Sequence, residues 1–138
     1  MLIPFDNEIL VYDELKIKDN SVSQVSLKEI FSRSDIISVQ LPFIESTRNI
    51  VDKKVLSIAK KNIKIINTSR GGIINEDDLF IFLDNNINAF AGLDVFEEEP
   101  CFNSKLMELK NFNATSHIGS MTDEGILSMG FAAIIGLD

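Results

Sequence analysis

The sequence predicts an α/β fold built on a parallel sheet, and three observations support this. Short runs rich in aliphatic residues alternate with stretches of helical period along the 138 residues, which is typical of parallel strands joined by right-handed helical crossovers. Several of the apolar runs stop abruptly at polar residues able to do chemistry. No internal repeat, low-complexity tract or linker interrupts the pattern, so we expect a single domain.

In the first half of the chain we expect, in order, a strand over residues 8–12, a helix over 26–33, a strand over 35–41 and a helix over 47–61. The first helix has Leu27, Ile30 and Phe31 on one side, at the spacing of an amphipathic helix. Pro42 ends the second strand because proline has no amide hydrogen to pair. The second helix carries its charged residues on the face that we expect to meet water.

In the second half we expect a strand over residues 63–67, a helix from Asn75 to about Asn85, strands over 89–95 and 112–115, and a helix over 125–137. Asn75 has the side chain of a helix N-cap, and the three acidic residues after it lie in the first turn, where the helix dipole favours negative charge. The last helix carries an apolar stripe.

Composition excludes several classes of protein. The net charge of −8 argues against a nucleic-acid surface. The single cysteine, Cys101, allows no internal disulfide and fits a reducing, cytoplasmic compartment. No apolar run approaches the roughly 18 residues that span a bilayer, so we expect no membrane partner. No set of metal-ligand residues is visible, and the N-terminus lacks the features of a signal peptide.

Three functional groups follow three predicted strands. Arg70, Glu99 and His117, the one histidine, each lie just past the end of an apolar run. Ligands bind beyond the carboxyl ends of the strands in open α/β sheets, so these groups suggest one shared site. An arginine, an acid and a histidine together can hold an anionic substrate and move a proton. The alternatives are a surface salt bridge for the arginine and a structural role for the histidine.

Five sequence blocks carry a resemblance to a known family. They are Leu10-Val-Tyr-Asp13, Val39-Gln-Leu-Pro42 with Glu45-Ser-Thr-Arg48, Asn67-Thr-Ser-Arg-Gly-Gly72, Leu93-Asp-Val-Phe-Glu-Glu-Glu-Pro100 and His117-Ile-Gly-Ser120. Together they resemble the D-isomer-specific 2-hydroxyacid dehydrogenases, which include phosphoglycerate and glyoxylate/hydroxypyruvate dehydrogenases, from about Ile9 to Leu137. Position 40 departs from the family because it is Gln where many members have His or Cys.

The resemblance implies a Rossmann-type parallel sheet with flanking helices that is truncated at its N-terminus. The family's glycine loop and first strand would lie before Met1, residues 1–6 would be the end of the helix after that loop, and no substrate domain is present. Residues 1–138 would thus be part of an NAD-binding domain, with about 121–138 as its C-terminal helix. The missing strand would leave a slot in the centre of the sheet.

The resemblance also implies roles for the three catalytic candidates. Arg70 would grip the substrate carboxylate and polarise the neighbouring carbonyl, which suits the planar fork of a guanidinium. His117 would be the general acid in reduction and the base in oxidation. Glu99 would orient the imidazole and favour its protonated form. Glu97 and Glu98 are rivals on sequence alone, and the family register selects the acid before the proline.

The implied cofactor is NAD. Asp13 would accept hydrogen bonds from the adenosine ribose hydroxyls, which favours NAD over NADP, although an Asp that starts a turn is the alternative. The other residues implied to border the cofactor are Leu41, Pro42, Thr68, Ser69, Arg70, Asp94, His117 and Gly119. Of these, Asp94 would hold the nicotinamide carboxamide.

The sequence therefore favours an NAD-dependent oxidoreductase acting on the CH–OH group of a D-2-hydroxy acid. Its partners would be a small 2-hydroxy or 2-keto acid and, in a complete enzyme, a second copy in a homodimer. A non-catalytic Rossmann remnant or assembly module without cofactor binding is the alternative. A different NAD-linked protein, similar to adenosylhomocysteine hydrolase, explains Glu99 and His117 less well.

Overall fold

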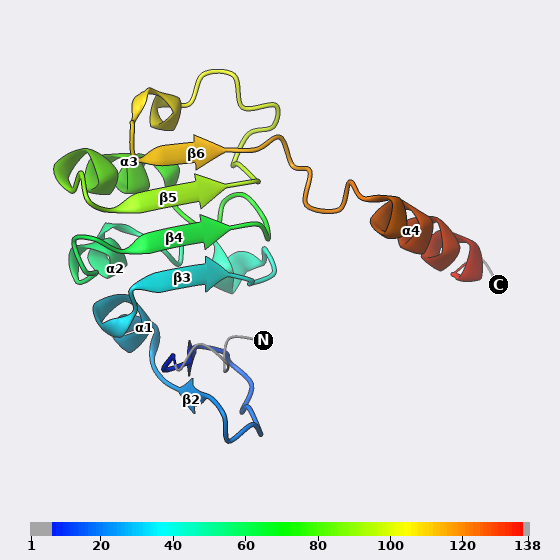
Figure 1. Cartoon of the computed structure of the whole chain (residues 1–138), viewed down its shortest axis with the longest axis horizontal. Coiled ribbons are helices and arrows are strands. Elements are labelled where there is room, and N and C mark those ends of the chain that lie inside the picture. Colours follow the sequence, from blue (N-terminus) through cyan, green and yellow to red (C-terminus); the bar gives the residue numbers. More distant parts are fainter. Residues whose placement is uncertain (1–6, 137–138) are drawn as a thin grey trace.

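A computed structural model describes residues 7–136 (Figure 1). Its strands are β1 (Leu10–Val11), β2 (Ser23–Gln24), β3 (Ile36–Val39), β4 (Lys64–Asn67), β5 (Phe90–Leu93) and β6 (Phe112–Ala114). Its helices are α1 (Leu27–Arg33), α2 (Lys53–Ser57), α3 (Glu76–Asn85) and α4 (Asp123–Ile135), with 3₁₀ turns η2 (Glu45–Thr47) and η3 (Lys105–Glu108). All strand pairs are parallel, so the predicted α/β class is confirmed.

The larger sheet has the order β3-β4-β5-β6 and holds the core. Strand residues such as Ile37, Ile65 and Leu93 point to one face and are buried against apolar side chains of α1, α2 and α3. The other face is more open, and Ile36 is 70% exposed there. A helix or loop connects each strand to the next. Because all pairs are parallel, the carboxyl ends of the strands lie at the same edge of the sheet (Figure 1).

A cleft separates the larger sheet from the two-stranded sheet of β1 and β2. Both β1 and β3 are edge strands, and no strand within residues 7–136 lies between them. Residues of the two strands line this cleft, whose volume is about 310 Å³. It lies where the resemblance predicts the slot of a missing first strand. The predicted end of a helix over residues 1–6 lies outside the described residues.

The helix predicted over residues 47–61 is wrong in extent. α2 covers only Lys53–Ser57, because the side chain of Asp52 caps it by accepting from the amides of Lys54 at 2.9 Å and Val55 at 3.0 Å. Before the cap, Val51 is buried and pairs with Ile74 in an isolated bridge. Val51, which lies within the predicted helix, therefore belongs to an extended segment.

Other differences are smaller. The strand predicted over 8–12 shortens to Leu10–Val11, and neither β2 nor η3 was expected. The C-terminal helix begins at Asp123, because Thr122 caps it by accepting from the Gly125 amide at 3.0 Å. No residue of α4 within the described part is buried, although most of its side chains are apolar. None of the described helices is long and apolar enough to cross a membrane.

Candidate functional site

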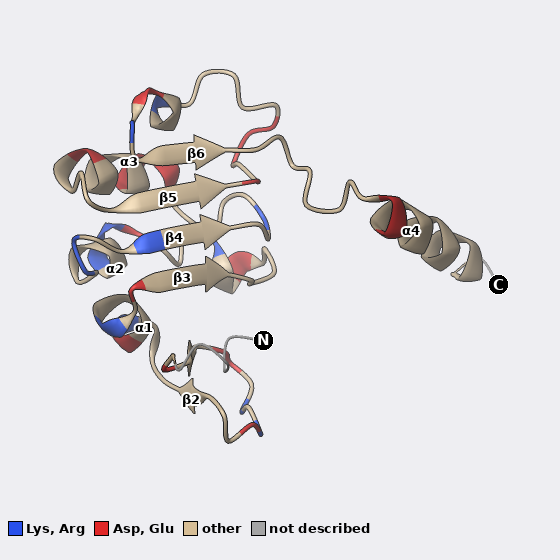
Figure 2. Ribbon diagram, in the orientation of Figure 1, with Lys and Arg blue, Asp and Glu red and all other residues tan. Residues whose placement is uncertain are grey.

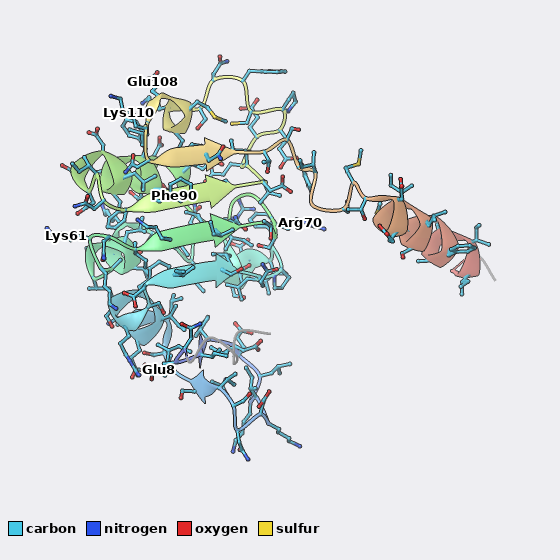
Figure 3. All side chains as sticks on the ribbon, viewed as in Figure 1. Glu8, Lys61, Arg70, Phe90, Glu108 and Lys110 are labelled. Carbon is cyan, nitrogen blue, oxygen red and sulfur yellow. The ribbon has the colours of Figure 1, made fainter. Side chains whose placement is uncertain are left out.

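The candidate residues lie at the carboxyl edge of the larger sheet. Arg70 follows β4, Glu99 follows β5 and His117 follows β6. Figure 2 shows a basic position in the loop after β4 and an acidic stretch in the loop after β5. Arg70 is exposed, and its side chain extends beyond the ends of the strands (Figure 3).

Glu99 and His117 are in direct contact. The Nδ1 atom of His117 lies 2.8 Å from Oε2 of Glu99, and the side chains are 47% and 38% exposed, respectively. The other carboxylate oxygen, Oε1, accepts from the amide of Phe96 at 3.0 Å. The hydrogen bond with His117, followed by that with the Phe96 amide, lowers the pKa of Glu99 below its usual value. Within residues 7–136, neither Glu97 nor Glu98 makes a hydrogen bond with His117.

The loop that carries His117 is held by Asp94, which comes directly after β5 and is 6% exposed. Its carboxylate accepts from the Thr115 hydroxyl, from the Ile118 amide at 3.0 Å and from the Gly119 amide at 2.9 Å. The Thr115 hydroxyl, with smaller effects of the two amides, lowers the pKa of Asp94. These bonds surround His117, whose φ of 55° lies in the left-handed region that most residues avoid.

The loop that carries Arg70 is held by Asn67, the last residue of β4. Asn67 is 1% exposed. Its Oδ1 accepts from the Ser69 amide at 3.0 Å and hydroxyl at 2.8 Å, and its Nδ2 donates to the Arg70 carbonyl at 3.0 Å. Our sequence reasoning missed this residue. The available signal was an Asn at the end of a buried strand with a Ser two positions later, a pattern typical of an Asx turn.

The loops that carry Arg70 and Glu99 meet at Phe96. A Cβ atom on Gly71 would lie 1.7 Å from the Phe96 carbonyl oxygen, so only glycine fits between the Arg70 loop and this backbone. The amide of the same Phe96 donates to Glu99. Among the described residues, no hydrogen bond or ion pair joins Arg70 directly to Glu99 or His117, so the site is assembled through the backbone.

The residues predicted to border the cofactor fall into two groups. Asp13 is exposed at the end of β1, where its Oδ1 accepts from the Leu15 amide at 2.8 Å, and both Asp13 and Leu41 line the cleft between β1 and β3. Thr68 accepts from Gln40 Nε2 at 3.3 Å. Pro42 is exposed, and Ser69 is turned back onto Asn67.

A second, larger cleft opens beside the Glu99–His117 pair, with a volume of about 810 Å³. Its lining residues are Asp94, Phe96, Glu99, Pro100, Cys101, Phe102, Met107, Ala114, Thr115, Ser116, His117 and Ile118. Acidic and imidazole groups thus face a space with mostly apolar walls. An arrangement of this kind can receive a small substrate next to a group that moves a proton.

Comparisons with known proteins identify related sequences. The family described as D-isomer specific 2-hydroxyacid dehydrogenase, NAD binding domain, matches residues 1–119. Hydroxypyruvate reductase of Thermotoga maritima is 38% identical over 136 residues, which are 96% of this chain and 44% of that protein. Glyoxylate reductase of Thermococcus litoralis is 41% identical over 100 residues, covering 72% of this chain and 30% of that protein.

Solved structures show the same fold. D-lactate dehydrogenase from Aquifex aeolicus, complexed with NAD and lactic acid, superposes with a TM-score of 0.87 at 25% identity over 98% of this chain and 46% of its own. The chain therefore spans less than half the length of these relatives. Because the family match extends over most of the sequence, the chain belongs to the D-isomer specific 2-hydroxyacid dehydrogenases, through their NAD-binding domain.

Proposed function

We propose that this chain supplies the catalytic residues of an NAD-dependent oxidoreductase that interconverts a D-2-hydroxy acid and its 2-keto acid. The observation that carries the proposal is the 2.8 Å contact between His117 and Glu99, at the sheet edge that also carries Arg70. A complete enzyme would take a small anionic substrate and would pair with a second copy.

The protein's own groups divide the work as follows. Arg70 binds the substrate carboxylate through its guanidinium and draws electron density from the adjacent carbonyl. Because Glu99 engages Nδ1 of His117, Nε2 is the nitrogen that faces the substrate. In reduction Nε2 gives a proton to the carbonyl oxygen, and in oxidation it takes the proton of the hydroxyl group. A nicotinamide cofactor, when bound, would supply the hydride in reduction and accept it in oxidation.

The residues fit the two ends of NAD better than its middle. The exposed carboxylate of Asp13 suits the adenosine ribose hydroxyls, and Leu41, which precedes Pro42, lines the same cleft. Thr68 and Ser69 follow β4, and Gly119 follows β6, at the edge that carries Arg70 and His117. Asp94 already accepts three hydrogen bonds, so a carboxamide would be an additional donor. Within residues 7–136, no Gly-x-Gly-x-x-Gly sequence precedes a helix to offer backbone amides to a pyrophosphate.

The experiment is a chimera in which this chain replaces the 136-residue segment that it matches in Thermotoga maritima hydroxypyruvate reductase. We expect the chimera to oxidise NADH in the presence of hydroxypyruvate. His117→Ala should lower kcat roughly 10²–10⁴-fold, as for other lost acid–base groups. Ser57→Ala is the control. It changes an exposed hydroxyl at the end of α2, just before β4, away from the carboxyl ends of the strands. A folded chimera without activity would refute the proposal.

A second candidate, a non-catalytic Rossmann module, is favoured by the cleft between β1 and β3. Among residues 7–136, no strand pairs with the sides of β1 and β3 that face this cleft, and such edges recruit other strands. We predict that the chain alone binds NAD weakly or not at all. Calorimetry on the purified chain tests this, and micromolar NAD binding would overturn it.

A further inference from the structure

Asn67 occupies a position where a parallel sheet usually places an apolar residue. It ends the central strand β4, and its side chain lies on the buried face together with Ile65 and Leu93. A buried amide is unfavourable unless its hydrogen bonds are made. Asn67 makes them with the loop that follows, accepting twice from Ser69 and donating once to the carbonyl of Arg70.

The backbone of Asn67 is hydrogen-bonded to the residue that follows the neighbouring strand, β5. Its carbonyl oxygen accepts from the amide of Asp94 at 2.9 Å. Asp94 in turn holds the loop of His117 through the amides of Ile118 and Gly119. One residue therefore contacts both the loop that presents Arg70 and the residue that anchors the loop of His117.

We propose that Asn67 is a positioning residue for Arg70, which fixes the guanidinium relative to His117. This rests on the proposed role of Arg70 in binding the substrate carboxylate. The Arg70 side chain is exposed, and its one described hydrogen bond runs from Nη1 to the Ser69 carbonyl at 2.6 Å, within the loop that Asn67 closes. The place of the guanidinium is therefore set by the backbone of residues 68–70 and not by a partner on another element.

Asn67 offers substitutions that separate its contacts. Asn67→Ala removes all three side-chain hydrogen bonds. Asn67→Asp keeps an oxygen for Ser69 and loses the donor to the Arg70 carbonyl. Asn113→Ala is the matched control, because Asn113 is an exposed asparagine in the nearby strand β6.

The first measurement uses the ¹⁵N-labelled chain and the heteronuclear NOE of its backbone amides. We expect Asn67→Ala to lower the NOE of residues 68–70, Asn67→Asp to lower it chiefly at Arg70, and Asn113→Ala to leave that loop unchanged. NOE values in Asn67→Ala that equal those of the control would refute the positioning role. This result does not depend on whether the chain belongs to an active enzyme.

The second measurement is a double-mutant cycle on kcat/KM in the chimera. Misplacement of a binding group costs up to roughly 10²-fold, so we expect Asn67→Ala to lower kcat/KM by roughly that factor, mainly through KM. In an Arg70→Lys background, whose ammonium lacks the two-point grip, the same change should cost less than about threefold. An equal loss in both backgrounds would show a purely structural role and refute the proposal. An inactive parent chimera would contradict the proposed function, and the NOE would then decide the role of Asn67.

Discussion

The contact between Glu99 and His117 gives a prediction that needs no activity. Glu99→Gln keeps the shape of the side chain and removes its negative charge. The hydrogen bond with His117 is the largest cause that lowers the pKa of Glu99, so the contact stabilises the folded chain at neutral pH, where Glu99 is ionised. Glu99→Gln should therefore lower the free energy of unfolding, and it should do so less when His117 is replaced by alanine as well.

The structure sets the size of this effect. Unit charges about 4 Å apart interact by about 1 kcal/mol in water and about 4 kcal/mol near a protein surface. The His117 and Glu99 side chains are 47% and 38% exposed, so solvent screening brings the interaction close to the lower value. The coupling energy between Glu99→Gln and His117→Ala should therefore be about 0.5–1 kcal/mol.

The assay is urea unfolding of the parent, the two single variants and the double variant at neutral pH. Glu98→Gln is the matched control, because within residues 7–136 the Glu98 side chain makes no hydrogen bond with His117. Its effect should add to that of His117→Ala. Because folding lowers the pKa of Glu99, the coupling should be lost as the pH falls through that pKa. Strict additivity of Glu99→Gln and His117→Ala would refute the coupling.

Three further predictions follow from other contacts of the site. Gly71→Ala should lower the free energy of unfolding by about 3 kcal/mol or more, because its Cβ would overlap the Phe96 carbonyl. Gly130→Ala is the control: its Cβ would meet open space, so the change should be neutral or stabilising. Urea unfolding of both variants makes the comparison. Asp94→Asn should cost about 1–3 kcal/mol at neutral pH. Because folding lowers the pKa of Asp94, its contribution is present above the ordinary value of 3.8 and is lost as the pH falls through the lowered pKa, so the stabilities of parent and variant should converge as unfolding is measured at decreasing pH. Asp13→Ala should shrink the preference of the chimera for NADH over NADPH in kcat/KM, and equal use of both cofactors by the parent would contradict the role of Asp13.

The order of strands and helices could be predicted because it depends on local patterns. Apolar runs such as Ile63–Asn67 are buried on a parallel sheet and read clearly in sequence. The helix predicted over 47–61 failed because periodicity does not show where a cap begins the helix or that Val51 pairs with Ile74. β2 was missed because its two exposed residues, Ser23 and Gln24, have no apolar pattern.

Only the part of the site that depends on where the strands end could be predicted from the sequence. The positions of Arg70, Glu99 and His117 at one edge follow from the parallel topology, which the alternating pattern already indicates. The bonds that orient these groups depend on loop conformation instead, and a positive φ at His117 has no signature in composition or spacing. Asn67 was overlooked for the same reason, since a polar residue at the end of a buried strand gains its meaning only from the loop that folds back onto it. The functional side chains can thus be predicted from the positions where strands end. The buried side chains of Asn67 and Asp94, which hold the loops of Arg70 and His117, can be recognised only in the folded structure.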